Sequence, residues 1–97
     1  MTEAFSPDPR AALKAALEQA LAQALSPTSM ALVDDSAAHA GHEGARSGAH
    51  FSLRIVSSRF QGLPRVARHR LVYDAVRPWM AGGVHALVIE ARTPDEG

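Results

Sequence analysis

The chain has 97 residues and a mass of 10.3 kDa, which suffices for one small domain and excludes a large multi-domain enzyme. Hydrophobic residues make up 46%, but 19 of them are alanine, so the core must be built largely from Leu, Val and Ile. Basic and acidic side chains cancel at ten each, and the absence of cysteine excludes disulfide scaffolds, thiolate metal sites and catalytic thiols.

The zero net charge hides an asymmetry along the chain. Residues 51–92 carry seven arginines against two carboxylates, which predicts an anion-facing surface on the second half. The first ten residues have neither a basic region nor a hydrophobic run, and no stretch approaches 18 apolar residues. We therefore expect a cytoplasmic protein without membrane contact, with a disordered leader over residues 1–8.

The first predicted element is a helix over about Pro9–Leu25. Asp8 is a suitable N-cap, and proline at the first helical position loses no hydrogen bond. A leucine recurs every four residues, at Leu13, Leu17, Leu21 and Leu25. This stripe predicts a helix packed on a sheet, and Ser26-Pro27 ends it.

Two strands and a long loop follow this helix. A short strand is predicted at about Met30–Asp34. Residues 36–49 contain three glycines and no apolar periodicity, which indicates a mobile loop that is disordered without a partner. Over His50–Ser57, apolar residues alternate with polar ones, as is typical of a half-buried strand.

The remaining elements are a short helical turn, a helix and a last strand. The turn is predicted at about Arg59–Leu63, and the helix runs from Pro64 to about Arg77, where Pro78 ends or kinks it. Val84–Arg92 is apolar on both sides and is therefore predicted to lie well inside the sheet.

This element order is α-β-β-α-α-β and predicts an α+β fold. We expect a single domain over residues 9–94, with a three-stranded mixed sheet, helices on one face and a tail over residues 95–97.

Without cysteine, five histidines are the only strong ligands for soft metals in the chain: His39, His42, His50, His69 and His85. Two of them form a His-x-x-His pair in the predicted loop, but none has the spacing of a helical zinc site. A zinc or copper site built from His39, His42 and His85 remains a minor alternative. No nucleophile elbow, carboxylate pair or phosphate-binding glycine loop is present, so we expect no enzymatic activity.

Four arginines lie on the second long helix: Arg65, Arg68, Arg70 and Arg77. A helical projection puts Arg70 and Arg77 beside Asp74, opposite the apolar side, where Asp74 can pair with both. Arg65 and Arg68 fall toward the apolar side, where long stems can reach over the helix start. A solvated, internally paired helix face is therefore favoured over a DNA-reading stripe, and His69 at the border suits a structural role.

Three segments together resemble the BolA family. They are Phe51–Phe60 (FSLRIVSSRF) followed by Gly62, then Arg68–Tyr73 (RHRLVY), then Val84–Leu87 (VHAL). The resemblance covers roughly residues 9–94 and implies an αββααβ fold related to class II KH domains, in agreement with the predicted element order.

The resemblance implies a partnership with a monothiol glutaredoxin around a shared [2Fe-2S] cluster, completed by glutathione. The family's C-terminal histidine ligand corresponds to His85. Its loop ligand corresponds to His39, with His42 as a close competitor. The chain alone is expected to bind no cluster and to be a monomer or weak homodimer.

The alternative role in this family is that of a DNA-binding regulator of morphology and stress genes. It would rely on the arginines Arg59, Arg65, Arg68, Arg70 and Arg77. The GxxG loop with which KH domains grip nucleic acid is missing, because the region reads Gly62-Leu63-Pro64-Arg65. The stretch Arg77–Met80 also departs from the family and is expected to shorten the helix. Trp79 then belongs either to the core or to a partner surface.

Overall fold

The structure is a computed structural model that describes residues 9–35, 49–81 and 84–96. Its elements follow in the order α1 (Pro9–Leu25), β1 (Ser29–Asp34), β2 (Ala49–Val56), the 3₁₀ turn η3 (Ser58–Phe60), α2 (Arg65–Met80) and β3 (Val84–Arg92). The predicted leader, residues 36–48 of the predicted loop and the Asp8 cap lie outside the described residues, whereas Ala49, the last residue of that loop, begins β2. Within those residues, no helix is both long and apolar enough to cross a membrane.

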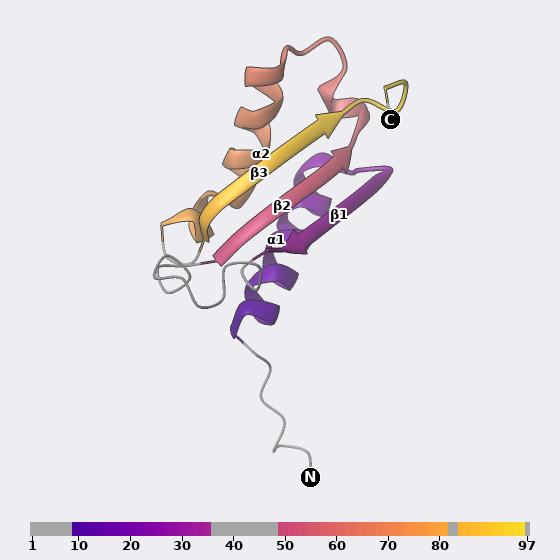
Figure 1. Ribbon diagram of the computed structural model, residues 1–97. Coiled ribbons are helices and arrows are strands. Elements are labelled where there is room, and N and C mark those ends of the chain that lie inside the picture. Colours follow the sequence, from indigo (N-terminus) through magenta and orange to yellow (C-terminus); the bar gives the residue numbers. More distant parts are fainter. Residues whose placement is uncertain (1–8, 36–48, 82–83, 97) are drawn as a thin grey trace.

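The three strands form one mixed sheet in the order β1-β2-β3. β1 and β2 are antiparallel, with Leu32 opposite Leu53, and β2 and β3 are parallel, with Leu53 opposite Ile89. Both helices cover the same face of the sheet (Figure 1). The predicted α+β architecture is confirmed.

The core lies between the helices and this face of the sheet. The alternation predicted for β2 is confirmed, because Phe51, Leu53 and Ile55 are buried while Arg54 is exposed. The helices and flanking segments add Leu17, Leu21, Leu25, Leu32, Ala49, Phe60, Val72, Val76 and Val84. The leucine stripe of α1 therefore packs on the sheet, as predicted, with Leu13 at its margin.

The position predicted for the last strand is wrong. β3 is an edge strand, and β2 is the central one. The apolar residues on the outer side of β3 are not covered by helices: the Val88 side chain is 66% exposed. The apolar residues on both sides of β3 therefore do not indicate a central strand. Those on its outer side are small or β-branched residues on a sheet face that no helix covers.

The helix α2 is longer than predicted, because it continues through Pro78 to Met80. Proline lacks an N–H group and so removes one hydrogen bond, to the carbonyl group four residues earlier. That loss falls in the last turn, where Trp79 and Met80 pack against the core and offset it. Trp79 is half-buried, in agreement with its interpretation as a core residue.

The predicted helical turn before α2 is the 3₁₀ turn η3, and Gly62 follows it with φ of 75°. This left-handed conformation favours glycine, which explains why the chain reverses here before α2 begins. η3 buries Phe60 completely.

Ser57 ties η3, α1 and β3 together. The side chain is fully buried, and its hydroxyl group donates a hydrogen bond to the Leu25 carbonyl oxygen at 2.5 Å and accepts one from the Arg59 N–H at 3.0 Å. The Ser57 N–H donates to the Arg92 carbonyl oxygen at 2.9 Å. The Ser57 side chain therefore binds the end of α1, and its backbone N–H binds the end of β3.

Replacing Ser57 by alanine is expected to lower the free energy of unfolding by about 1–3 kcal/mol, because the Leu25 carbonyl oxygen loses a buried donor. Urea unfolding at constant slope measures the change. Ser58→Ala, at the exposed neighbouring position, is the matched control and should change stability by less than about 0.5 kcal/mol. Equal effects of the two substitutions would contradict the role given to Ser57.

Candidate functional site

The predicted ligand His85 lies at an irregularity in the pairing of β2 with β3. Ala49 is opposite Val84 and His50 is opposite Ala86, so His85 is an additional residue in β3. An extra residue of this kind bends the strand locally, and such bulges are frequent at sheet edges and beside functional sites. The sequence pattern places His85 in a regular strand, whereas the structure places it at a bulge.

The other two predicted ligands, His39 and His42, lie outside the described residues, in the segment 36–48. The structure describes the residues on either side of that segment, and these define where it leaves and re-enters the sheet.

Both flanks of the segment lie at the end of the sheet where β3 begins. The Asp35 N–H donates a hydrogen bond to the His50 carbonyl oxygen at 2.7 Å. Ala49 pairs directly with Val84, the residue before His85. The starts of β2 and β3 lie side by side in Figure 1. The segment that carries His39 and His42 thus leaves the sheet at the end of β1, with β2 between it and β3, and re-enters at Ala49, next to the start of β3.

His50 is a further histidine near this position, and no sequence motif marks it as a ligand. It lies opposite Ala86, one residue beyond His85. Its neighbours Ala49 and Phe51 are in the core, so His50 belongs to the opposite face of the sheet, yet its ring is half-buried and Nε2 is buried. Strand alternation predicts the face, but only the pairing of β2 with β3 shows that His50 and His85 are neighbours. Among the described residues, no three metal-binding side chains form a cluster.

Arg68 reaches over the start of α2, as predicted. Its Nε group donates to the Leu63 carbonyl oxygen at 2.8 Å, and Nη1 donates to the Ala91 carbonyl oxygen at 3.1 Å. The same guanidinium binds both carboxylate oxygens of Glu96, at 2.6 and 3.1 Å. Glu96, which the sequence analysis assigns to a tail, thus ties the C-terminal turn to α2. Arg68 is only 15% exposed, and its guanidinium is already engaged by these partners.

The other arginines of the DNA-binding hypothesis are exposed but dispersed. Arg77 forms the predicted ion pair with Asp74, whereas the structure gives Arg70 no ion pair with a described residue. Arg65 lies in the first turn of α2, and Arg59 lies in η3. As the helical projection predicts, the arginines do not form one stripe.

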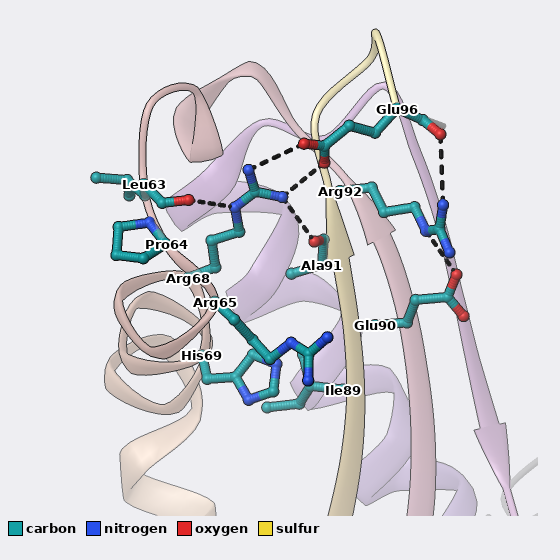
Figure 2. Close-up of a pocket in the computed structure, with 10 residues that line it drawn as sticks. All are labelled: Leu63, Pro64, Arg65, Arg68, His69, Ile89, Glu90, Ala91, Arg92 and Glu96. Carbon is teal, nitrogen blue, oxygen red and sulfur yellow. Dashed lines mark hydrogen bonds and ion pairs between the residues drawn. The ribbon is translucent and has the colours of Figure 1, made fainter.

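A cavity of about 560 Å³ lies between the start of α2, the second half of β3 and the C-terminal turn (Figure 2). Its lining consists of Leu63, Pro64, Arg65, Arg68, His69, Ile89, Glu90, Ala91, Arg92 and Glu96. This cavity is at the opposite end of β3 from His85. His69, expected to be structural, is half-buried in its wall.

The Arg68 guanidinium and the Thr93 N–H lower the pKa of Glu96 to about 2, and Glu96 in turn raises the pKa of Arg68. Because the folded-state pKa of Glu96 lies below its ordinary value of 4.5, the pair stabilises the fold above about pH 4.5. This stabilisation is lost as the pH falls through about 2.

A Glu96→Gln variant is therefore expected to melt at a lower temperature than the parent at pH 7, and the difference should shrink between pH 4.5 and 2. The difference should be modest and should decrease with added salt, because Glu96 is half-exposed to solvent. Thermal melts between pH 7 and 2, in low and high salt, measure it. Asp95→Asn, at the exposed neighbouring carboxylate, is the control. A pH-independent difference would show that Glu96 does not act through its charge.

Comparison with known proteins gives one consistent result. The BolA-like protein family matches residues 21–96. The chain is 46% identical over 82 residues to BolA-like protein 1 of Pongo abelii, covering 84% of this chain and 58% of that protein. It is 46% identical over 78 residues to the SufE-like protein 1, chloroplastic/mitochondrial, of Arabidopsis thaliana, covering 74% of this chain and 21% of that protein.

The fold comparison agrees with the sequence comparison. The BolA domain of SufE1 from Arabidopsis thaliana superimposes with a TM-score of 0.77 and 40% sequence identity, covering 95% of this chain and 100% of that one. The chain spans 58% of the length of the animal relative, so the shared part is the domain described above. With the family matched over residues 21–96 and the fold matched over 95% of the chain, this chain belongs to the BolA-like protein family.

Proposed function

We propose that this protein is a non-enzymatic partner of a monothiol glutaredoxin and shares a [2Fe-2S] cluster with it. His85 supplies one ligand and His39 the second, with His42 as the alternate. The glutaredoxin supplies its cysteine thiolate, and glutathione supplies a further sulfur atom. The protein then acts in the trafficking of clusters or in iron sensing, and it binds no cluster alone.

The composition of the chain supports a ligand set of this kind. Without cysteine, the chain can bind iron only through imidazole or oxygen groups. Two imidazoles can replace two thiolates on one iron of a [2Fe-2S] cluster, which raises its reduction potential. A partner must then provide the sulfur ligands. The relative named SufE-like, which carries this domain within a longer protein, fits a role connected with iron–sulfur clusters.

The observation that carries the proposal is the pairing of Ala49 with Val84. It brings one end of the segment 36–48 next to His85, at a bulge on an edge strand. A ligand from that segment and a ligand from β3 can therefore meet at one end of the sheet, without a rearrangement of the core.

The test is a titration of the protein into a cluster-loaded monothiol glutaredoxin with glutathione, followed by visible absorption and circular dichroism. The expected result is a new spectrum that saturates at one molecule of this protein per glutaredoxin. The protein alone is the control and should remain colourless. A spectrum that stays that of the glutaredoxin at every ratio would overturn the proposal.

The alternative proposal is a DNA-binding regulator that uses the exposed arginines of α2. It requires an affinity that falls steeply with salt and depends on Arg70 or Arg77, because phosphate contacts release counterions. A gel shift at low ionic strength, repeated with Arg70→Gln, separates the two proposals. A shift that is absent or insensitive to salt would remove this alternative.

Since the plant relatives are named as chloroplastic or mitochondrial, family membership does not restrict the compartment to the cytoplasm.

A further inference from the structure

In the cavity at the start of α2, the Arg68 guanidinium and the Thr93 N–H bind a carboxylate of the chain itself, that of Glu96. Glu96 Oε1 accepts hydrogen bonds from Arg68 at 2.6 Å and from the Thr93 N–H at 3.0 Å, and Oε2 accepts from Arg68 at 3.1 Å. The Arg68 fork is held in this orientation by the Leu63 and Ala91 carbonyl oxygens. A guanidinium positioned in this way binds planar or tetrahedral oxyanions in a two-point geometry.

The cavity lining carries three arginines against two carboxylates, Glu90 and Glu96, so one positive charge remains. Arg65 and His69 lie one helical turn apart on α2, and both line the cavity. Figure 2 shows both side chains between α2 and β3, on the side of Ile89. The structure gives neither of them an ion pair with a described residue.

The remaining arginine of the cavity is already engaged. Arg92 binds the Glu90 carboxylate at 2.7 Å and the Glu96 carbonyl oxygen at 3.4 Å. The groups that remain to donate hydrogen bonds to a ligand are therefore Arg65 and His69, together with Arg68 whenever Glu96 moves away. Three donors of this kind suit a ligand with two negative charges and several acceptor oxygens.

We propose that this cavity binds the phosphate monoester group of a small phosphorylated molecule, in competition with Glu96. A phosphate monoester carries close to two negative charges at neutral pH and has three terminal oxygens, whereas Glu96 carries one charge and two oxygens. The volume of about 560 Å³ lies within the range of small-molecule sites, and Ile89 and Leu63 provide apolar walls for the rest of the ligand.

The arrangement favours a single phosphate over a nucleic-acid backbone. A backbone needs a row of cationic groups, but Arg77 is paired with Asp74 on the exposed side of α2, outside the cavity lining. The cavity is also distinct from the proposed cluster site, because it lies at the Ile89–Arg92 end of β3 and His85 lies at the other end. Binding here therefore does not depend on the glutaredoxin proposal.

The test is an NMR titration of the ¹⁵N-labelled protein with inorganic phosphate, a nucleoside 5′-monophosphate and the corresponding nucleoside, at constant ionic strength set with sodium chloride. The expected result is saturable shifts for both phosphates, confined to amides around Arg65, His69, Thr93 and Glu96. The nucleoside should give no such shifts. Equal binding of nucleoside and monophosphate would overturn the proposal.

Variants distinguish a specific phosphate site in the cavity from a nonspecific attraction of anions to exposed arginines. Arg65→Gln and His69→Gln should each weaken phosphate binding by about tenfold, the loss expected for one charge-assisted hydrogen bond. Glu96→Gln should tighten it severalfold, because the internal competitor loses its charge. Arg70→Gln changes an exposed arginine of the same helix outside the cavity and is the matched control.

Two outcomes would contradict the proposal through these variants. One is an equal weakening by Arg70→Gln and Arg65→Gln, and the other is unchanged affinity in Glu96→Gln. A single-stranded oligonucleotide with and without a 5′-phosphate completes the experiment. If the affinity is the same with and without the 5′-phosphate and increases with oligonucleotide length, the surface binds nucleic acid and the small-molecule proposal is overturned.

Discussion

A His85→Ala variant is expected to form no mixed cluster complex with a monothiol glutaredoxin. Titrated into the cluster-loaded glutaredoxin with glutathione, it should leave the visible absorption and circular dichroism at those of the glutaredoxin alone. The reason is that the chain has no cysteine to fill the vacant iron position. Removing a group that only hydrogen-bonds to a metal ligand lowers metal affinity by roughly 10–100-fold. Removing the ligand itself should therefore lower it by about 100-fold or more.

Two matched variants make this experiment specific. His85→Cys keeps a ligand at the bulge and should retain the cluster at a lower reduction potential, because a thiolate replaces an imidazole. His69→Ala removes a histidine of α2 from the cavity beside the far end of β3 and should leave the spectrum unchanged. A parental spectrum in His85→Ala would exclude the proposed ligand.

The same assay identifies the second ligand. We expect His39→Ala to lose the mixed spectrum and His42→Ala to retain it. The reverse pattern would assign the ligand to His42, and retention of the spectrum by both single variants and by the double variant would exclude ligation from the segment 36–48. Far-UV circular dichroism of each variant shows whether its fold is intact.

The largest effect on stability is expected from Phe60→Ala, which should lower the free energy of unfolding by about 3–5 kcal/mol. Phe60 is fully buried in η3, where it belongs to the core cluster. Aromatic residues are few in this chain, so the neighbours offer little bulk to fill the space left by the ring. A domain of this size is stabilised by only about 5–15 kcal/mol in total, and the variant should therefore be close to unfolding at 37 °C.

Urea unfolding with far-UV circular dichroism measures this loss. Phe60→Leu should recover most of the stability, because it restores apolar volume to the same position. Val66→Ala is the surface control, since the Val66 side chain is 66% exposed, and it should change stability by less than about 0.5 kcal/mol. A loss below 1 kcal/mol for Phe60→Ala would show that η3 is not packed on the core as described.

Features that depend on neighbouring residues in the chain were predictable. The four-residue leucine repeat between Pro9 and Ser26-Pro27 predicts α1 with the bounds that the structure has. The alternation of β2 predicts which of its side chains are buried, because successive side chains in a strand point to opposite faces. The position of Arg68 near the apolar side of α2 likewise predicts that it reaches over the helix start.

Local pattern was least reliable where long-range packing competes with it. Pro78 is a helix-ending signal, yet α2 continues because Trp79 and Met80 gain contacts with the core. The two-sided hydrophobicity of β3 is typical of a central strand, yet β3 lies at the edge. Proline costs α2 one hydrogen bond, and the edge position costs β3 the exposure of a few methyl groups. Tertiary packing outweighs both costs.

By itself, the sequence determined the family, the element order and the five histidines from which the proposed ligands are drawn. These follow from residue types and short spacings, which do not depend on how the chain closes on itself. Only the tertiary structure decided that His50 neighbours His85 and that Glu96 occupies the Arg68 fork, 28 residues away along the chain. Strand register and the docking of a terminal turn are set by contacts between distant segments, and no local pattern encodes them.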